Sequence, residues 1–524
     1  MKKIKKLIVT LLCVFPLINT MAMGSVQAQD PVEGGTLVVS TAAEPETYNP
    51  NAAPNNAAKV VIENVMNKLL KINGYSEIVP DIAESYEFSE DGLNLTFHLT
   101  PDVKWHDGEP FSAEDVKWTF DQILSEEGFA ASSLADIEEV EVIDENTVNF
   151  KLSEPNAGIL SAIAWHGTQI MPKHIYEGTD WLDNEANQHP IGTGPFKFKE
   201  HIPGDYLVLE KNEEYFKEGP YLDEVVVRFI PDGDVAYQAF LNGETDENRN
   251  GVPADEIPTM EENEDYVVTD ISFPNMGNIV FNMKDGIFTD KKLREAVLYA
   301  IDRQDMLEKN YRGNGSIAEY YIPYQYAWAL NEDAKVPERD VERARELIEE
   351  AGYELNEDGY YFETTIDTYP GWDNFVPILA QQLEEVGIKL NHNSMDDGSY
   401  DEKVLEQQDF ELTMHQGYIG PDISALAYKY GTGQAMNYGI YSSETMDALL
   451  EEGNREVDPE KRAEIYREIQ ALLAEELPTI PTWNWGAKLV TKAYVKGHPM
   501  ADQDSRKING EIEFTNVWLD NTNE

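Results

Sequence analysis

The chain of 524 residues is 41% apolar, which is sufficient for two or three domains with substantial cores and is typical of a soluble globular protein. Its 98 acidic residues against 40 basic ones give a formal net charge of −58 at pH 7. This excess argues against nucleic acid or anionic lipid as a partner, because binding phosphates requires a basic patch. It is typical of a solvated surface in a salty habitat, where salt screens the repulsion.

Residues 1–28 have the pattern of a cleaved secretory signal peptide. Four lysines stand among the first six residues, an apolar run covers residues 7–18, and small and polar residues end at Ala28, where we expect cleavage. The apolar run is well short of the ~20 residues that a spanning helix needs. The only cysteine, Cys13, lies inside this segment, so the mature chain is expected to have neither a disulfide nor a thiol nucleophile.

The mature chain is predicted to begin with a strand at residues 35–41, followed by a turn-rich loop that ends in Asn49-Pro50. A helix is expected over residues 59–72, because its apolar residues recur at helical spacing.

A tight hairpin is predicted at Asp91-Gly92, which stands between two stretches of alternating apolar residues. In the second strand the apolar residues face one side and Asn94, Thr96 and His98 the other, so one face is expected to be buried and one wet. After a loop, Ser112 is placed to cap a helix that ends near residue 123.

Downstream, the pattern predicts alternating strands and helices, which indicate an α/β domain. Strands are expected at residues 147–152, 206–211, 225–230, 360–367 and 410–414, and helices at 340–351, 374–386 and 459–476. A further helix follows residue 290, because Leu293, Ala296, Val297 and Ala300 form one apolar stripe. The GTGP segment at residues 192–195 lacks the third glycine and the helix of a phosphate loop and is expected to be a tight turn.

The run from Asp91 to Ile123, DGLNLTFHLTPDVKWHDGEPFSAEDVKWTFDQI, strongly resembles the signature of the family-5 extracytoplasmic solute-binding proteins. These proteins deliver oligopeptides, dipeptides, nickel complexes or oligosaccharides to ABC importers. IGTGPFKFKEH from Ile191 and LPTIPTWNWGAKLV from Leu477 resemble the same family. The resemblance implies an α/β clamp of the periplasmic-binding-protein type: two lobes with an extra small domain, built of mixed sheets flanked by helices.

The resemblance also implies a division of the chain. Domain I is expected to comprise residues 29–75, 189–277 and 490–524, the small domain II residues 76–188, and domain III residues 278–489. Such a protein is expected to be a monomer that closes over its ligand and docks on an ABC permease at the membrane. Many relatives are lipid-anchored through a cysteine after a short Leu-x-Gly or Leu-x-Ala motif; residues 10–13 fit this pattern poorly, so we expect a free periplasmic protein.

Catalytic and cofactor motifs are missing from the sequence, which has no G-x-S-x-G, H-E-x-x-H, Walker or dinucleotide pattern. We therefore expect a binding protein without cofactor rather than an enzyme, with a secreted hydrolase as the non-transport alternative. Asp246, Asn248 and Asn250 follow the opening of a calcium loop, but the twelfth position is Ile257 in place of Glu. The alternative is an Asn-rich surface turn.

An oligopeptide or dipeptide is the leading ligand. In peptide-binding members of the family a W-x-x-D-Y-x-D-P type loop supplies a carboxylate to the peptide ammonium, and residues 415–422, HQGYIGPD, match it. Aligned on Pro421, that carboxylate falls at Gly417, so the charge partner is missing. Asp422 or Glu44 is expected to replace it. Thr47 and Tyr48 are further candidates, since the loop after the first strand reaches the cleft in the family.

An oligosaccharide is the runner-up, because aromatic faces stack on sugar rings. The aromatic candidates are Tyr369, Trp372, Tyr418, Trp483 and Trp485. Trp483 and Trp485 alternate on one strand, so both are expected to face the cleft or both to be buried. A nickel complex is the third option, supported only by His166 and His415.

Overall fold

The computed structural model describes residues 30–52, 56–73, 77–249, 251–312, 314–418, 420, 422–499 and 512–520. The predicted signal peptide and Asn250 of the calcium motif lie outside these ranges.

A mixed sheet of 11 strands runs through the described part of the chain in the order β15-β14-β16-β12-β17-β11-β1-β10-β9-β8, with β13 beside β17. Two of these strands are long: β12 (Tyr266–Phe281) and β17 (Thr479–Lys492) pair antiparallel along most of their length. The other strands are β1 (Thr36–Thr41), β8 (Phe196–Ile202), β9 (Tyr206–Lys211), β10 (Glu224–Phe229), β11 (Glu247–Asn248), β13 (Ser316–Ile317), β14 (Phe362–Thr368), β15 (Ile388–Ser394) and β16 (Leu412–Tyr418).

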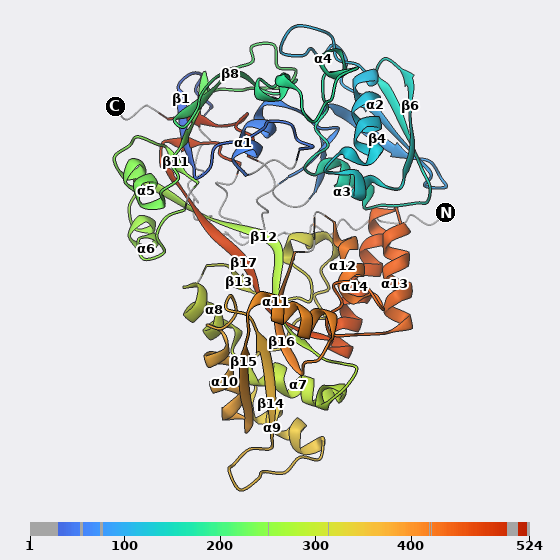
Figure 1. Ribbon diagram of the computed structural model, residues 1–524, viewed down its shortest axis with the longest axis vertical. Coiled ribbons are helices and arrows are strands. Elements are labelled where there is room, and N and C mark those ends of the chain that lie inside the picture. Colours follow the sequence, from blue (N-terminus) through green and yellow to red (C-terminus); the bar gives the residue numbers. More distant parts are fainter. Residues whose placement is uncertain are drawn as a thin grey trace, which may run out of the picture. The chain divides into compact units, whose positions relative to one another are not determined.

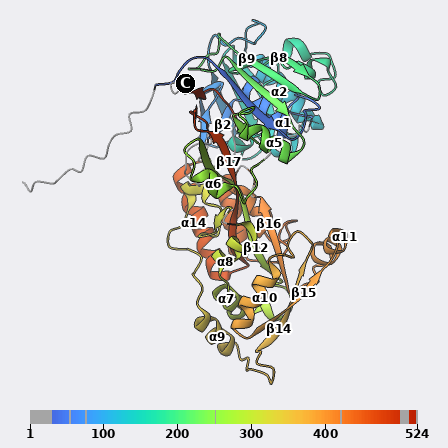
Figure 2. The ribbon, with the colours of Figure 1, turned by 90° about the vertical axis from the view of Figure 1, so that its left-hand side faces the viewer.

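Two large hydrophobic cores lie on either side of this strand pair. One core is built from residues between 37 and 229 together with 495–519, and the other from residues between 279 and 483. We call the described residues of 32–265 and 493–520 lobe 1, and those of 282–478 lobe 2. Figure 1 shows β12 and β17 running from β11 in lobe 1 to β16 in lobe 2, and Figure 2 shows the same strands after a quarter turn. The two strands therefore connect the lobes.

Lobe 1 contains a second sheet of four antiparallel strands in the order β4-β5-β7-β6. Its strands are β4 (Ala83–Phe88), β5 (Asn94–Leu99), β6 (Ile137–Asp144) and β7 (Thr147–Leu152). The hairpin predicted at Asp91-Gly92 joins β4 and β5 and is confirmed. The helix α2 (Ala113–Gln122) follows Ser112, whose backbone N–H donates to the Asp115 carboxylate at 2.9 Å, as in a capping box.

The predicted helices are present together with several that were not predicted, and one predicted helix is shorter than expected. They are α1 (Asn56–Val65), α3 (Ile159–Ala164), α4 (Lys173–Tyr176), α5 (Gly233–Leu241), α6 (Ile257–Glu261), α7 (Lys291–Ala300), α8 (Arg303–Tyr311), α9 (Val341–Glu350), α10 (Val376–Glu385), α11 (Asp397–Tyr400), α12 (Leu426–Tyr430), α13 (Glu444–Arg455) and α14 (Pro459–Glu476). The helix predicted over residues 59–72 ends at Val65, and residues 70–72 form β2 (Leu70–Ile72), paired with β3 (Ile78–Pro80). A short pair, β18 (Val495–Lys496) and β19 (Trp518–Leu519), completes lobe 1.

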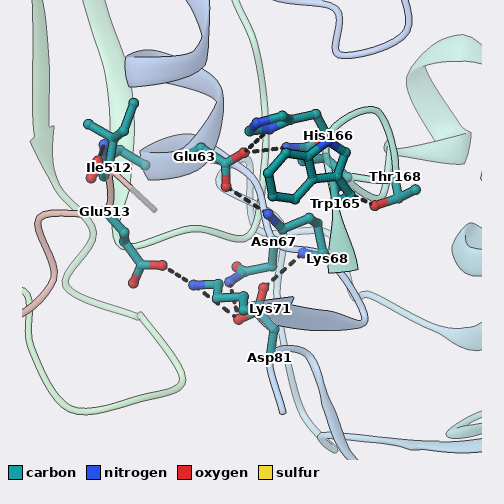
Figure 3. A network of polar contacts seen from close by, with 12 residues as sticks. Glu63, Asn67, Lys68, Lys71, Asp81, Trp165, His166, Thr168, Ile512 and Glu513 are labelled. Atoms are coloured by element: carbon teal, nitrogen blue, oxygen red, sulfur yellow. Dashed lines mark hydrogen bonds and ion pairs between the residues drawn. The ribbon is translucent and has the colours of Figure 1, made fainter. Parts of the chain in front are cut away.

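A buried polar network explains the early end of α1 (Figure 3). The Asp81 carboxylate accepts hydrogen bonds from the backbone N–H of Lys68 and the Asn67 side chain, both at 2.8 Å. It also pairs with the Lys71 ammonium at 3.3 Å, and Lys71 in turn contacts Glu513. Because Lys68 gives its backbone N–H to Asp81, that N–H is not available to a continued helix.

Candidate functional site

The segment that corresponds to the expected ligand loop lies where three strands meet. Gly417 near the end of β16 pairs with Met276 of β12, and Met276 pairs on its other side with Asn484 of β17. The pairing of β12 with β17 is irregular on both sides of this point. The site is thus at the junction of the connecting strands with lobe 2.

Lys429 of α12 fills the space beside Gly417. A Cβ atom at residue 417 would lie 2.4 Å from the Lys429 Nζ and 2.7 Å from its Cε, so glycine is needed for the lysine to lie there. The Nζ is buried and has no hydrogen-bond partner among the described residues, although the residue as a whole is only half-buried. Burial lowers the pKa of Lys429 to about 8.

His415 lies two residues before Gly417 on the same face of β16. Its ring packs on Tyr438 with centroids 4.3 Å apart. Burial, and then the neighbouring Lys429, lower its pKa to about 3, so the imidazole is neutral at neutral pH. His415 and Lys429 line a cavity of about 20 Å³, together with Asn278, Tyr438 and Thr479. The cavity has room for one water-sized group.

Asp422, one of the two carboxylates expected to replace the missing charge partner, already has hydrogen-bond partners within the protein. Its carboxylate accepts two hydrogen bonds from the Arg462 guanidinium, at 2.6 and 3.0 Å, and one from the Ser424 backbone N–H at 2.8 Å. Arg462 outweighs burial and holds the pKa of Asp422 low, at about 2. The hydroxyl of Ser161, in α3 of lobe 1, also donates to this carboxylate at 3.2 Å. Asp422 therefore bridges the lobes.

Two further contacts and a recess lie beside this bridge. The Ala157 backbone N–H donates to the Asn454 carbonyl at 3.1 Å, and Arg455 donates to Glu154 at 3.3 Å. A recess of about 340 Å³ is lined by residues of both lobes, among them Asn156 and Tyr428. Lobe 1 and lobe 2 thus face each other at the loop that carries Asp422.

Glu44, Thr47 and Tyr48 lie together in lobe 1. The Glu44 carboxylate is 2.9 Å from His201 Nε2 and also accepts from the Gly204 backbone N–H at 3.0 Å. The Tyr48 hydroxyl is 3.4 Å from the other ring nitrogen of His201, and burial raises the pKa of this tyrosine. The Thr47 hydroxyl accepts from the Asn49 backbone N–H at 3.1 Å. These contacts tie the loop to the turn between β8 and β9.

The described aromatic candidates are divided between buried and half-buried positions. Trp483 is 0% exposed and stacks on Phe375 with ring centroids 4.4 Å apart, and Trp372 is 5% exposed in the same core. Tyr369 packs on Tyr400 at 5.1 Å. The side chain of Tyr418 lies outside the described part of the structure.

Trp485 is half-buried, so the expectation that both tryptophans share one environment is wrong. Beside Trp485 the strand pairing is irregular: Ser272 pairs with Gly486 and Met276 with Asn484, so three residues of β12 stand opposite this one residue of β17.

The described residues of the calcium motif, Asp246 and Asn248, lie beside or in β11 of the large sheet. Asp246 accepts hydrogen bonds from the Val38 backbone N–H at 2.7 Å and from the Tyr494 hydroxyl, and Asn248 accepts from Ser40 at 3.1 Å. These oxygens hold β11 beside β1 and are thereby occupied. Within the described ranges no group of three or more His, Cys, Asp or Glu side chains is arranged to hold a metal ion.

The nickel candidates lie in different lobes. His166 is in lobe 1, where its Nδ1 is 3.3 Å from the Glu63 carboxylate (Figure 3). Glu63 also pairs with Lys68 at 2.9 Å and accepts from Gln169 at 2.9 Å. His166 thus belongs to a buried network of lobe 1, whereas His415 lies against Lys429 in lobe 2.

Sequence reasoning identified Gly417 but missed Lys429. The lysine stands twelve residues downstream on a helix of five residues, and no motif spacing connects the two positions. The only signal was the missing charge at residue 417.

Two lobes joined by paired strands, with polar loops of both lobes at the junction, define a clamp-type binding protein. Residues 77–438 match the model of the bacterial extracellular solute-binding proteins, family 5, and the chain belongs to that family. Among the described residues, none of the helices has the length and apolar character that crossing a bilayer requires.

Relatives match nearly the whole chain. The oligopeptide-binding protein AppA of Bacillus subtilis is 29% identical, covering 86% of each chain. The dipeptide-binding protein of Escherichia coli is 26% identical over 86% of this chain and 89% of its own. The crystal structure of the ABC transporter substrate-binding protein CtaP of Listeria monocytogenes, 25% identical, superposes with a TM-score of 0.78 over 93% of this chain and 99% of that chain. These matches support the α/β clamp fold.

Proposed function

We propose that this protein captures an oligopeptide or dipeptide in the cleft between its lobes and delivers it to the permease of an ABC importer. The observation that carries the proposal is the near full-length similarity to relatives named oligopeptide- and dipeptide-binding proteins. The bridge from Ser161 to Asp422 supports a clamp, because a contact made between lobes stabilises one arrangement of the lobes over others.

The oligosaccharide alternative loses much of its support. It depended on exposed aromatic rings, but Trp372 and Trp483 are packed in the core of lobe 2. A nickel complex is disfavoured because His166 and His415 belong to separate networks.

The remaining parts of the proposal concern the whole chain. We infer cleavage after Ala28 and release as a free periplasmic monomer without a lipid anchor or catalytic activity. The acidic surface is proposed to be an adaptation to high salt. We also propose the three-domain division; it is supported by the four-stranded sheet, which lies within residues 76–188, and by the connecting strands, inside which the boundaries at residues 277 and 489 fall.

The test is retention of ligand by the purified mature protein. It is incubated at high salt with a tryptic digest of casein and, separately, with a pool of oligosaccharides, passed through a desalting column and denatured for mass spectrometry. Retention of peptides is expected. Retention of sugars alone, or chemical conversion of either pool, would overturn the proposal.

A further inference from the structure

The ammonium of Lys429 is a buried cation without a counter-charge among the described residues. Buried Lys492 is held over the rings of Phe240 and Tyr266, whereas Lys68 and Lys71 each have a carboxylate at short range: Glu63 at 2.9 Å and Asp81 at 3.3 Å. Lys429 has none, in a sequence with 98 acidic residues. A buried charge without a partner is costly, so such a group is normally retained where a partner arrives from outside.

The groups that face Lys429 do not supply that partner. His415 is neutral at neutral pH, and Tyr438 and Tyr430 are phenols whose pKa is raised by burial. The cavity beside the ammonium is about 20 Å³, the size of one oxygen-sized group. Gly417 contributes no side chain that would cover the ammonium on the strand side.

Polar atoms without a partner among the described residues are also found at the adjoining strand junction; the amide oxygens among them accept hydrogen bonds, so they suit N–H groups of a ligand and not its carboxylate. The Oδ1 atoms of Asn275 in β12 and Asn484 in β17, and the Oγ1 of Thr482, are buried without a hydrogen-bond partner among the described residues. Asn275 pairs with Tyr418, and Asn484 pairs with the residue that pairs with Gly417. Unpaired buried polar atoms are uncommon in folded proteins, and here several belong to the same irregular strand junction.

We propose that the Lys429 ammonium, held beside Gly417, binds a carboxylate of the peptide ligand. The carboxylate is either the peptide's C-terminal group or an Asp or Glu side chain, since both present the same charge and oxygens. This inference rests on the proposed function. It specifies the ligand further: the site selects a peptide with an anionic group beside Gly417, where the carboxylate expected from the family is missing.

The test compares carboxylates with their neutral esters. The same casein digest is used untreated and after methyl esterification, which neutralises every carboxylate. Wild-type protein is expected to retain peptides from the untreated digest and to lose them after esterification. C-terminally amidated copies of the retained peptides, and copies with Gln in place of Glu, then distinguish the two sources. A charge-assisted hydrogen bond predicts about a 10- to 100-fold loss of affinity for the relevant neutral copy.

Variants test whether Lys429 is the residue that distinguishes acidic from neutral peptides. In Lys429→Met, acid and neutral peptides are expected to bind with equal, weak affinity, while Lys461→Met, which removes an exposed lysine from α14 of the same lobe, is expected to behave as wild type. Lys429→Gln serves if the Met variant does not fold.

Equal retention of both digests by wild type, or an unchanged preference for acids in both Lys429 variants, would overturn the carboxylate site and leave peptide binding intact. Retention of no peptide from either digest would overturn the proposed function itself. Loss of acid preference in Lys461→Met would assign the preference to overall charge instead of Lys429.

Discussion

Replacing Lys429 by Met is expected to stabilise the ligand-free protein. Burial lowers the pKa of this lysine from the ordinary 10.5 to about 8. One pKa unit corresponds to about 1.4 kcal/mol, so the charged form destabilises the fold by about 3 kcal/mol at neutral pH. Methionine has a similar length and no charge. The variant should therefore gain up to about 3 kcal/mol in free energy of unfolding.

The gain has a defined pH dependence. Below pH 8 the lysine is protonated in both the folded and unfolded states, and the penalty is complete. Between about 8 and 10.5 the folded state releases its proton while the unfolded state keeps it, so wild-type stability rises relative to the variant. Above 10.5 both states are neutral, and the difference due to charge disappears.

Urea unfolding followed by tryptophan fluorescence at about pH 7, 9 and 10.5 measures this difference, with Lys461→Met as the control for loss of a lysine charge. Comparing each variant with wild type at the same pH cancels the other titrating groups. A Lys429→Met protein that is less stable than wild type at pH 7, or a difference that does not change with pH, would refute the assignment of a buried unpaired ammonium.

Three further outcomes follow from the same structure. Asp422→Asn removes one partner of a buried ion pair and should cost about 3–5 kcal/mol in urea unfolding, and an unchanged midpoint would contradict the pairing with Arg462. Gly417→Asp puts side-chain atoms into the space that Lys429 fills, so the ammonium must shift and then has a carboxylate of the protein beside it; both effects should block retention of acidic peptides in the esterification assay, and retention at the wild-type level would contradict the close approach of the two residues. Melting temperature should rise as NaCl increases from about 0.1 to 1 M, because the screening length falls from about 10 to 3 Å, and a salt-independent value would contradict surface self-repulsion at a net charge of −58.

Local patterns predicted most of the fold because each depends on neighbouring residues. The Asp91-Gly92 turn and the α14 helix, Pro459–Glu476, are found where the sequence placed them. The end of α1 was missed because Asp81, a residue outside the predicted helix, takes the Lys68 backbone N–H. Such a contact becomes visible only when the chain is folded.

The candidate site was less predictable, since it depends on the sheet rather than on spacing. Trp483 and Trp485 alternate along β17 yet differ in burial, because burial depends on neighbours that are distant in sequence, such as Phe375 stacked on Trp483. Asp422 was expected to be available for a ligand, but Arg462, forty residues away, already binds it with two hydrogen bonds. The sequence predicted that the carboxylate of the family is missing at Gly417, but it did not predict that Lys429 lies beside this residue.

The Lys429 ammonium has no carboxylate partner among the described residues, although the chain is rich in carboxylates. This contrast connects the composition of the chain with the proposed ligand specificity. A surface rich in carboxylates offers counter-charges to almost any lysine that reaches it, and exposed pairs such as Lys389 with Glu363 at 2.9 Å are formed in this way. A lysine stays unpaired only if its surroundings exclude the protein's own acids, as the neutral ring of His415, the phenol of Tyr438 and the bare backbone of Gly417 do here. Because the protein's own acids are excluded, the ammonium stays available for an anionic group of the ligand. Its positive charge also attracts an acidic peptide, which the net negative charge of the protein otherwise repels.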